Sequence, residues 1–189
     1  MQITSQEFLA EINKFIVPTK TPFIIAIAGG SGSGKSYISK RIAEAYQALV
    51  ISTDDYYIRT GNKNKDIPSE LNLDLLRKNL EDLIAGKPTE KPIYTFGNKQ
   101  DSKEIIHPNK VILVDGIFAL NPKLADLEDL RIFVDSPEQV RLTRRLKRDS
   151  EERNYPRERT EQAWRETVQP MYLQWVLPQK SIADMIIDN

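Results

Sequence analysis

The chain has 189 residues, 40% of them hydrophobic and 29% charged, which is typical of one soluble globular domain with a sizeable core. Basic and acidic residues number 27 each, so the net charge is zero, and bulk electrostatic binding to nucleic acid or to anionic membranes is disfavoured. The absence of cysteine excludes disulfides, thiolate metal sites and a cysteine nucleophile. The sequence shows neither a long apolar span nor a signal-peptide pattern, so we expect a cytoplasmic protein without nucleic-acid or membrane partners.

The N-terminal part of the chain begins with an amphipathic stretch. Apolar side chains at helical spacing predict a helix over residues 4–16, with Thr4 and Glu7 as a capping box. The continuous apolar run 23–28 is typical of a strand buried on both faces of a parallel sheet. A glycine-rich loop follows directly, and the spacing of apolar residues then predicts a helix over residues 36–47.

Short apolar runs and amphipathic stretches alternate along the rest of the chain, which favours a parallel sheet covered by helices. Two weaker runs, 92–96 and 103–106, predict a β-hairpin over about residues 90–107 that lies across the substrate side of the site. No linker divides the sequence, so a single domain over residues 1–189 is expected. Further strands are predicted at 49–52, 111–115, 131–135 and 185–187. Further helices are predicted at 74–85, 137–150 and 160–176.

Four of the eight glycines lie within six residues, between the first long strand and the helix after it. Residues 29–36, Gly-Gly-Ser-Gly-Ser-Gly-Lys-Ser, match the phosphate-loop pattern G-x-x-x-x-G-K-[ST] in the strand–loop–helix context that it requires. Small residues let backbone N–H groups surround phosphate oxygens, and the helix N-terminus adds partial positive charge. Lys35 then reaches the β- and γ-phosphates, and the Ser36 hydroxyl ligates Mg²⁺. A Gly/Ser-rich turn is the alternative interpretation, which this context disfavours. The predicted ATP-binding residues of the segment are Gly29, Gly30, Ser31, Gly32, Ser33, Gly34, Lys35, Ser36 and Tyr37.

Acidic residues follow two predicted strands at their carboxyl ends, where open parallel sheets bind ligands. Asp115 suits the carboxylate on the Mg²⁺ side that partners the loop serine. Of Asp54 and Asp55, one is expected to accept the proton of an attacking substrate hydroxyl. A turn cap is an equal alternative for Asp55, whereas the positions of Asp54 and Asp115 favour function. Asp135 also ends a strand, but Pro137 follows closely, which predicts that Asp135 caps the next helix.

Arginines recur at helical spacing in the charged stretch that follows. Arg141, Arg144, Arg145 and Arg148 fall at i, i+3, i+4 and i+7, so they share one face of a helix. Guanidinium groups suit phosphate oxygens and the charge that develops in phosphoryl transfer. One interpretation is a lid over about residues 141–160, in which some of these arginines help to keep water out. The other is a solvated helix face whose arginines pair with neighbouring acids.

These motifs together resemble the uridine kinase and phosphoribulokinase family of P-loop kinases, over nearly the whole chain from Phe23 to Asp188. The family's S-x-D-[SD]-[FY]-[FY] segment resembles Ser52-Thr-Asp-Asp-Tyr-Tyr57, and its P-x-Y-[DN]-F segment is similar to Pro92-Ile-Tyr-Thr-Phe96. Its arginine-rich lid pattern is followed closely at 141–153. The predicted fold is therefore a P-loop NTPase-type three-layer α/β/α arrangement with a central, mostly parallel five-stranded sheet, a helical lid and a small β-hairpin.

The resemblance implies a phosphotransferase with an alcohol group as acceptor. It would transfer the γ-phosphate of ATP, with Mg²⁺, to a primary hydroxyl of a small molecule, which in uridine kinases is the ribose 5′-OH; it also suggests a homo-oligomer. Asp54 would be the catalytic base, and the ribose-side acid falls on Asp66 or, in a competing alignment, on Asp74. The implied catalytic residues are Asp54, Lys35 and Arg148. Arg144 and Arg148 would join the ATP site, Ser36 and Asp115 would ligate the metal, and the acceptor site would comprise Asp54, Tyr57, Asp66, Tyr94, Phe96, Arg145 and Arg153.

Two departures from the family pattern bear on the acceptor. Uridine kinases have a histidine that reads the pyrimidine edge where this chain has Lys99, and the second arginine of the family's E-R-G-R is missing from Glu152-Arg-Asn-Tyr155. Both departures count against simple uridine or cytidine recognition. A nicotinamide riboside kinase-like acceptor is the alternative, because Gln169-Pro-Met-Tyr-Leu173 resembles the W-P-M-Y-L stretch of those kinases. A nucleotide-binding switch without an acceptor is a further rival, and ATP or GTP as donor stays open. The only histidine, His107, is predicted to be a loop residue without a catalytic role.

Overall fold

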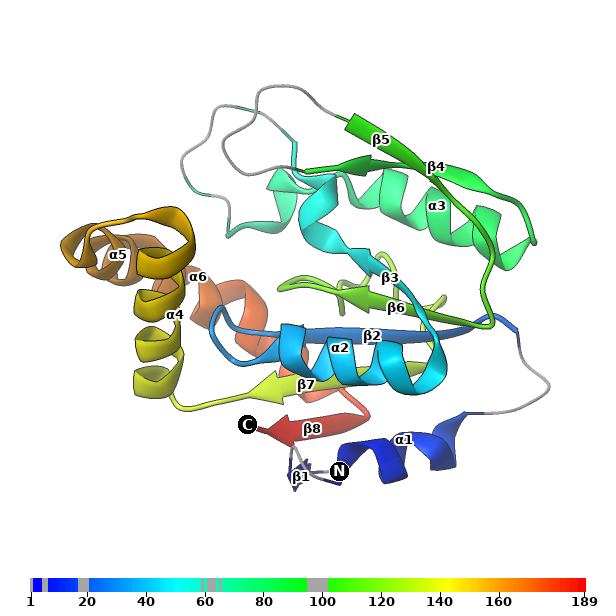
Figure 1. The fold of residues 1–189 in the computed structure, drawn as a ribbon, viewed down its shortest axis with the longest axis horizontal. Coiled ribbons are helices and arrows are strands. Elements are labelled where there is room, and N and C mark those ends of the chain that lie inside the picture. Colours follow the sequence, from blue (N-terminus) through cyan, green and yellow to red (C-terminus); the bar gives the residue numbers. More distant parts are fainter. Residues whose placement is uncertain are drawn as a thin grey trace.

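The computed structural model of the protein describes residues 2–4, 7–16, 21–58, 60, 64, 66–94 and 102–189. In this part of the chain, a six-stranded sheet in the order β1-β8-β7-β2-β6-β3 lies between layers of helices (Figure 1). All of its neighbouring strands are parallel, which confirms the predicted α/β fold. The strands are β1 (Gln2–Thr4), β2 (Phe23–Gly29), β3 (Leu49–Ser52), β6 (Val111–Asp115), β7 (Leu130–Asp135) and β8 (Met185–Asp188).

The sheet has one strand more than the five predicted, because residues 2–4 form β1. This strand pairs with β8, with Gln2 opposite Ile186, and the predicted first helix therefore begins later, as α1 (Phe8–Phe15). The Thr4 hydroxyl still donates to the Glu7 carboxylate at 3.1 Å, but Thr4 lies in the strand and does not cap the helix. A three-residue edge strand is too short to show a periodic pattern, and its partner is at the other end of the chain.

The apolar run of β2 is buried because β2 lies inside the sheet, between β7 and β6. Successive side chains of a strand point to opposite faces. Ile25 and Ile27 pack in one core cluster with Phe8 of α1 and with residues of the helix after the phosphate loop. Ile24 and its neighbours on the opposite face pack in a second cluster. The two clusters fill the two layers between the sheet and its helices.

The predicted helices are confirmed to within a few residues. The last of them changes character along its length, with wide π-turns at Trp164–Val168 and Tyr172–Val176 on either side of a short α-helical segment. Pro170 in that segment has no N–H group to donate, and such a gap in the hydrogen-bond ladder favours wider turns. The α-helices after α1 are α2 (Lys35–Tyr46), α3 (Leu73–Ile84), α4 (Glu138–Arg153), α5 (Arg157–Ala163) and α6 (Gln169–Met171). Short 3₁₀ turns lie at Thr53–Tyr56, Pro68–Glu70 and Leu177–Ile182.

A separate two-stranded antiparallel hairpin lies beside α3, at the β3 side of the main sheet (Figure 1). Its strands are β4 (Thr89–Ile93) and β5 (Ser102–Ile106), which confirms a hairpin that starts three residues earlier than the predicted run. Buried hydrogen bonds fix its place, because the Tyr56 hydroxyl donates to Asn79 Oδ1 at 2.9 Å and Asn79 Nδ2 donates to Thr89 Oγ1 at 2.8 Å. The hairpin is thereby tied both to α3 and to the turn that follows β3.

Candidate active site

The glycine-rich loop joins β2 to α2 in a backbone conformation that larger residues would not fit. Gly32 and Gly34 have φ values of +78° and +95°, in the region that favours glycine. A Cβ atom at Gly32 would overlap the backbone carbonyl of Arg141, and one at Gly34 would overlap the side chain of Asn189. The loop is therefore a backbone-lined cradle, as expected for a phosphate site.

The back of this loop is hydrogen-bonded to three other segments. The Ser33 carbonyl accepts from Asn189 Nδ2 at 2.9 Å, from Ser136 Oγ at 3.0 Å and from Arg144 Nη1 at 3.3 Å. The Ser33 side chain is buried without a hydrogen-bond partner. Arg144, a predicted ATP ligand, thus contacts the loop backbone itself while it also lines the adjoining cavity.

A cavity of about 730 Å³ opens in front of the loop, at the carboxyl ends of the parallel strands. Lys35 lies on one side, where its Nζ donates to the Gly30 carbonyl at 3.0 Å. Burial lowers the pKa of Lys35, and the carboxylates of Asp115 and Asp54 oppose that shift. Ser36 also lines the cavity, so the loop presents an amine and a hydroxyl to a bound anion.

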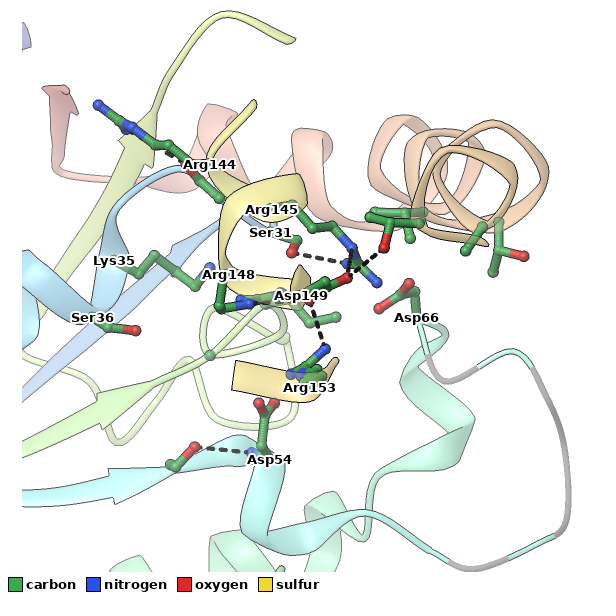
Figure 2. A pocket seen from close by; sticks show the side chains of 18 of the residues that line it. Ser31, Lys35, Ser36, Asp54, Asp66, Arg144, Arg145, Arg148, Asp149 and Arg153 are labelled. Atoms are coloured by element: carbon green, nitrogen blue, oxygen red, sulfur yellow. Dashed lines mark hydrogen bonds and ion pairs between the residues drawn. The ribbon is translucent and has the colours of Figure 1, made fainter. Parts of the chain in front are cut away.

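Acidic residues line the other sides of this cavity, among them Asp54, Asp66 and Asp115, and Figure 2 shows the carboxylate of Asp54 directed into it. Asp54 lies in the turn after β3, where its N–H donates to Ser52 Oγ at 3.2 Å. The carboxylate is accessible from the cavity, yet the surrounding protein desolvates it and raises its pKa, with Lys35 opposing and Asp115 adding to the rise. Burial likewise raises the pKa values of Asp66 and Asp115.

The other aspartates considered from the sequence, Asp74, Asp55 and Asp135, each form an ion pair with a lysine. Asp74 lies outside the cavity and pairs with Lys123 at 2.7 Å, with 80% of its side chain exposed. Asp55 lines the cavity, but its carboxylate accepts from Lys91 Nζ at 2.7 Å. The prediction that Asp135 caps the following helix is wrong, because its carboxylate pairs with Lys180 at 2.5 Å and α4 begins without a side-chain cap.

The arginine face of α4 divides into a buried part and a part that faces the cavity. Arg141 is 2% exposed and lies between the rings of Tyr172 and Trp164, whose centroids are 3.8 and 5.2 Å from its guanidinium carbon. It donates to the Ser136 carbonyl and to Gln169. Arg141 therefore supports the base of the loop and is not part of the solvated face that the spacing also allowed.

A single buried carboxylate, that of Asp149, which is 2% exposed, binds three of the other arginines. Figure 2 shows it beside Arg145, Arg148 and Arg153, with ion-pair distances of 3.3, 3.2 and 3.1 Å. Arg145 also donates to Ser31 Oγ at 2.9 Å, which links the arginine group to the phosphate loop. Sequence analysis missed Asp149 as a site residue, although its spacing of four residues from both Arg145 and Arg153 is that of helix ion pairs.

Most of the predicted site residues line the cavity. Gly29, Gly30 and Ser33 form the base of the loop behind it, and the Tyr37 ring points away, 55% exposed and beside Arg41. Phe96 and Lys99 lie outside the described residues. His107 lies in the loop after β5, as predicted, and it does not line the cavity. The predicted residues that line it are Ser31, Gly32, Gly34, Lys35, Ser36, Asp54, Tyr57, Asp66, Tyr94, Asp115, Arg144, Arg145, Arg148 and Arg153. The lining residues that were not predicted include Tyr155, Arg159, Thr160 and Thr167, besides Asp149.

A magnesium ion at this site would be coordinated by protein side chains together with phosphate oxygens of a bound nucleotide. Within the described ranges, no three histidine, aspartate or glutamate side chains gather as a metal cluster. Ser36 and Asp115 offer oxygen ligands, which suit Mg²⁺, and this ion commonly completes its octahedral shell with water and substrate phosphates. The residues present therefore fit a metal that binds together with a nucleotide. In the part of the chain that the structure describes, each helix is too short or too polar to cross a membrane.

A buried strand, a glycine cradle with a lysine and a helix, and acids at the ends of adjacent strands define the class of P-loop α/β proteins. Comparison with known families goes one step further. The sequence pattern of the phosphoribulokinase / uridine kinase family matches residues 24–189, and the chain belongs to this family.

Similar proteins and structures agree with this assignment. A uridine kinase of Ligilactobacillus salivarius is 39% identical over 180 residues, which cover 88% of this chain and 84% of that relative. A uridine kinase of Macrococcus caseolyticus is 40% identical over 178 residues, or 87% of this chain and 86% of the relative. The crystal structure of a putative fructose transport system kinase from Silicibacter shows the same fold at 15% identity, with a TM-score of 0.78 over 95% of this chain and 96% of that one.

Proposed function

We propose that the protein is an ATP-dependent nucleoside kinase that transfers the γ-phosphate to the ribose 5′-OH, with uridine as the first acceptor to test. The observation that carries the proposal is the meeting of Lys35, Asp54 and Asp115 around one cavity in front of the phosphate loop. Relatives named uridine kinase, at 36–40% identity over most of the chain, support a nucleoside as acceptor. We also propose a cytoplasmic enzyme, which the family's small-molecule chemistry supports.

On the donor side, the loop backbone binds the phosphates and Lys35 neutralises the charge that develops on the transferred group. The lowered pKa of Lys35 reflects its burial in the ligand-free cavity, and a bound polyphosphate would favour the charged amine. Mg²⁺, held with the phosphates by Ser36 and Asp115, would supply further charge neutralisation. Tyr37 is not included in this site, because its N–H donates to the Gly34 carbonyl at 3.1 Å and its ring lies outside the cavity.

On the acceptor side, Asp54 accepts the proton of the ribose hydroxyl as its oxygen attacks the γ-phosphorus. The desolvation that raises the pKa of Asp54 makes its carboxylate a stronger base than an exposed aspartate. Asp66 is suited to bind the ribose hydroxyls, because it lines the same cavity and Asp74 does not. Tyr57 and Tyr94, whose ring centroids are 5.5 Å apart, would contact the base, and Phe96 stays a prediction.

The arginines of α4 form the third wall. Arg145 and Arg148 face the cavity next to the loop and share the carboxylate of Asp149 with Arg153. Guanidinium groups at this position would bind phosphate oxygens and help to exclude water while the γ-phosphate is reactive. The segment 141–160 is therefore proposed as a lid over the donor.

A panel of acceptors with radiolabelled ATP tests the proposal. Uridine, cytidine, nicotinamide riboside and pantothenate are compared, with GTP as a second donor, and the phosphorylated product is identified by mass spectrometry. Labelled nucleoside 5′-monophosphate is expected. If only nicotinamide riboside is phosphorylated, that compound replaces uridine as the proposed acceptor. The departures from the family pattern at Lys99 and Tyr155 would then be explained by the change of acceptor. Slow hydrolysis of ATP with no labelled acceptor would instead support a nucleotide-dependent switch.

A further inference from the structure

An ionic cluster around the buried amine of Lys91 connects the turn that carries Asp54 to the hairpin beside it. Lys91 of β4 donates to Asp55 Oδ2 at 2.7 Å and lies 2.7 Å from Glu104 Oε1 of β5. Asp55 directly follows Asp54 in the turn after β3, and Glu104 is the cross-strand neighbour of Lys91 in the hairpin. One lysine therefore joins both strands of the hairpin to the turn after β3, which lies 36 residues earlier in the sequence.

The burial of this lysine is unusual for its residue type. Its side chain is 6% exposed, and that of Asp55 is 18% exposed, whereas lysines are rarely buried without a partner. Burial alone would lower the pKa of Lys91, but the hydrogen bonds to Asp55 and Glu104 outweigh it and raise the pKa. The amine therefore stays charged at neutral pH.

The second oxygen of Asp55 acts on the cavity itself. Asp55 Oδ1 accepts from the N–H of Tyr94 at 3.1 Å, and Tyr94 lies directly after β4 with its ring against that of Tyr57. Both tyrosines line the cavity. The same carboxylate thus sets the position of Tyr94 relative to Asp54, the neighbouring residue in the turn.

We propose that Asp55 and Lys91 are a positioning pair that fixes the acceptor wall of the cavity, so that the pair controls the binding of the nucleoside and not that of ATP. This inference rests on the proposed nucleoside kinase function. The loop that would bind ATP is held by other residues, since its Ser33 carbonyl accepts from Asn189, Ser136 and Arg144. A change at Asp55 should therefore leave the donor half in place.

Steady-state kinetics of four purified variants test the pair. Asp55→Ala removes both contacts of the carboxylate, Asp55→Asn keeps an oxygen for the N–H of Tyr94, and Lys91→Met removes the charge that Asp55 binds. Lys103→Met is the matched control, because Lys103 is on the same hairpin but pairs with Glu90 at 2.6 Å on an exposed surface, with side chains 62% and 55% exposed. Thermal unfolding of each variant shows whether it is folded at the assay temperature.

Asp55→Ala and Lys91→Met are expected to raise the KM for the nucleoside by roughly ten- to a hundredfold, as displaced substrate-positioning groups do, with the KM for ATP unchanged. Asp55→Asn should raise this KM less than Asp55→Ala does, and Lys103→Met should match the wild type.

A nucleoside KM that stays at the wild-type value in Asp55→Ala, or equal increases in the KM for the nucleoside and for ATP, would overturn the positioning role. If Asp55→Ala fails to fold, the conservative Asp55→Asn and the Lys91→Met variants decide the same question. A wild-type protein that phosphorylates no acceptor would instead overturn the proposed function, before any variant is compared.

Discussion

The proposed donor and acceptor halves of the cavity are built in different ways. The proposed donor half comes from one contiguous loop, residues 29–36, whose glycines determine its backbone shape and whose Ser33 carbonyl accepts hydrogen bonds from side chains behind it. The acceptor half is assembled from the turn after β3, from Asp66 and from the hairpin, which are joined by side-chain contacts such as that of Asp55 with Lys91. The backbone-built half should therefore tolerate few substitutions, whereas the side-chain-built half can change its ligand with a few replacements.

The largest effect is expected on the donor side, at Lys35. Lys35→Met removes the positive charge beside the transferred phosphate and should lower kcat/KM for ATP by roughly 10²–10³-fold, the usual cost of losing one group that stabilises developing charge. Lys40→Met is the control, since Lys40 lies on the same helix with 76% of its side chain exposed and only a 3.8 Å contact with Glu44. Equal kinetics of the two variants would exclude Lys35 from the donor site.

The next prediction distinguishes two effects of replacing a glycine, which are the strain of a positive φ and the steric overlap of the new Cβ atom. Gly32 and Gly86 both have positive φ values, +78° and +74°, but a Cβ atom would overlap Arg141 at Gly32 and meet no atom at Gly86. Replacement by alanine should cost about 1–2 kcal/mol of stability at either position from the backbone alone. Only Gly32→Ala should also weaken ATP binding, because overpacking of about 1–3 kcal/mol would displace the loop. Calorimetric titration with ATP measures the difference, and unchanged affinity in Gly32→Ala would show that the loop can shift without cost.

On the acceptor side, Asp66 and Asp74 provide a direct comparison of the two alignments. Asp66→Asn should raise the KM for the nucleoside about tenfold, in line with the loss of a hydrogen bond to a charged group, and leave the KM for ATP unchanged. Asp74→Asn should leave both constants unchanged, since Asp74 pairs with Lys123 outside the cavity. The opposite pattern would assign the ribose-side acid to Asp74.

The smallest effect concerns pH and stability. Burial raises the pKa values of Asp54, Asp66 and Asp115 above those of the unfolded chain, so the stability that these groups contribute is present at low pH and is lost as pH rises through the raised values. In the ligand-free protein, Asp54→Asn should therefore be more stabilising near about pH 7 than near about pH 5. Thermal unfolding of wild type and variant at both pH values measures this, and a stabilisation that grows as pH falls would contradict the sign.

The sequence predicted the strand, loop and helix of the proposed donor half well because their signal is local. The strand at 23–28, the loop and Lys35 are adjacent in the chain, and the structure places them as expected. The extra strand β1 and the pairing of Asp135 with Lys180 were not predictable, because each depends on a partner distant in sequence. The same reason left the role of Asp55 open, since only the folded hairpin brings Lys91 to it.

The arginine-rich helix α4 was predicted only in part. Helical spacing predicted that Arg144, Arg145 and Arg148 share one face of a helix and left open whether that face is solvated or part of a site; in the structure all three line the cavity. It did not separate them from Arg141, which has the same spacing but is buried against Tyr172 and Trp164. Periodicity defines a helix face but not what covers it, and that depends on the π-turns of the C-terminal helix.

The most direct measurement is the transfer of label from radiolabelled ATP to the acceptor by Asp54→Asn, compared with wild type at saturating ATP. Removal of a general base should reduce transfer by roughly 10²–10⁴-fold, with the dissociation constant of ATP unchanged because Asp54 lies across the cavity from the loop backbone. Wild type should form the nucleoside 5′-monophosphate and Asp54→Asn almost none. Equal rates of nucleoside phosphorylation by the two proteins would contradict the account.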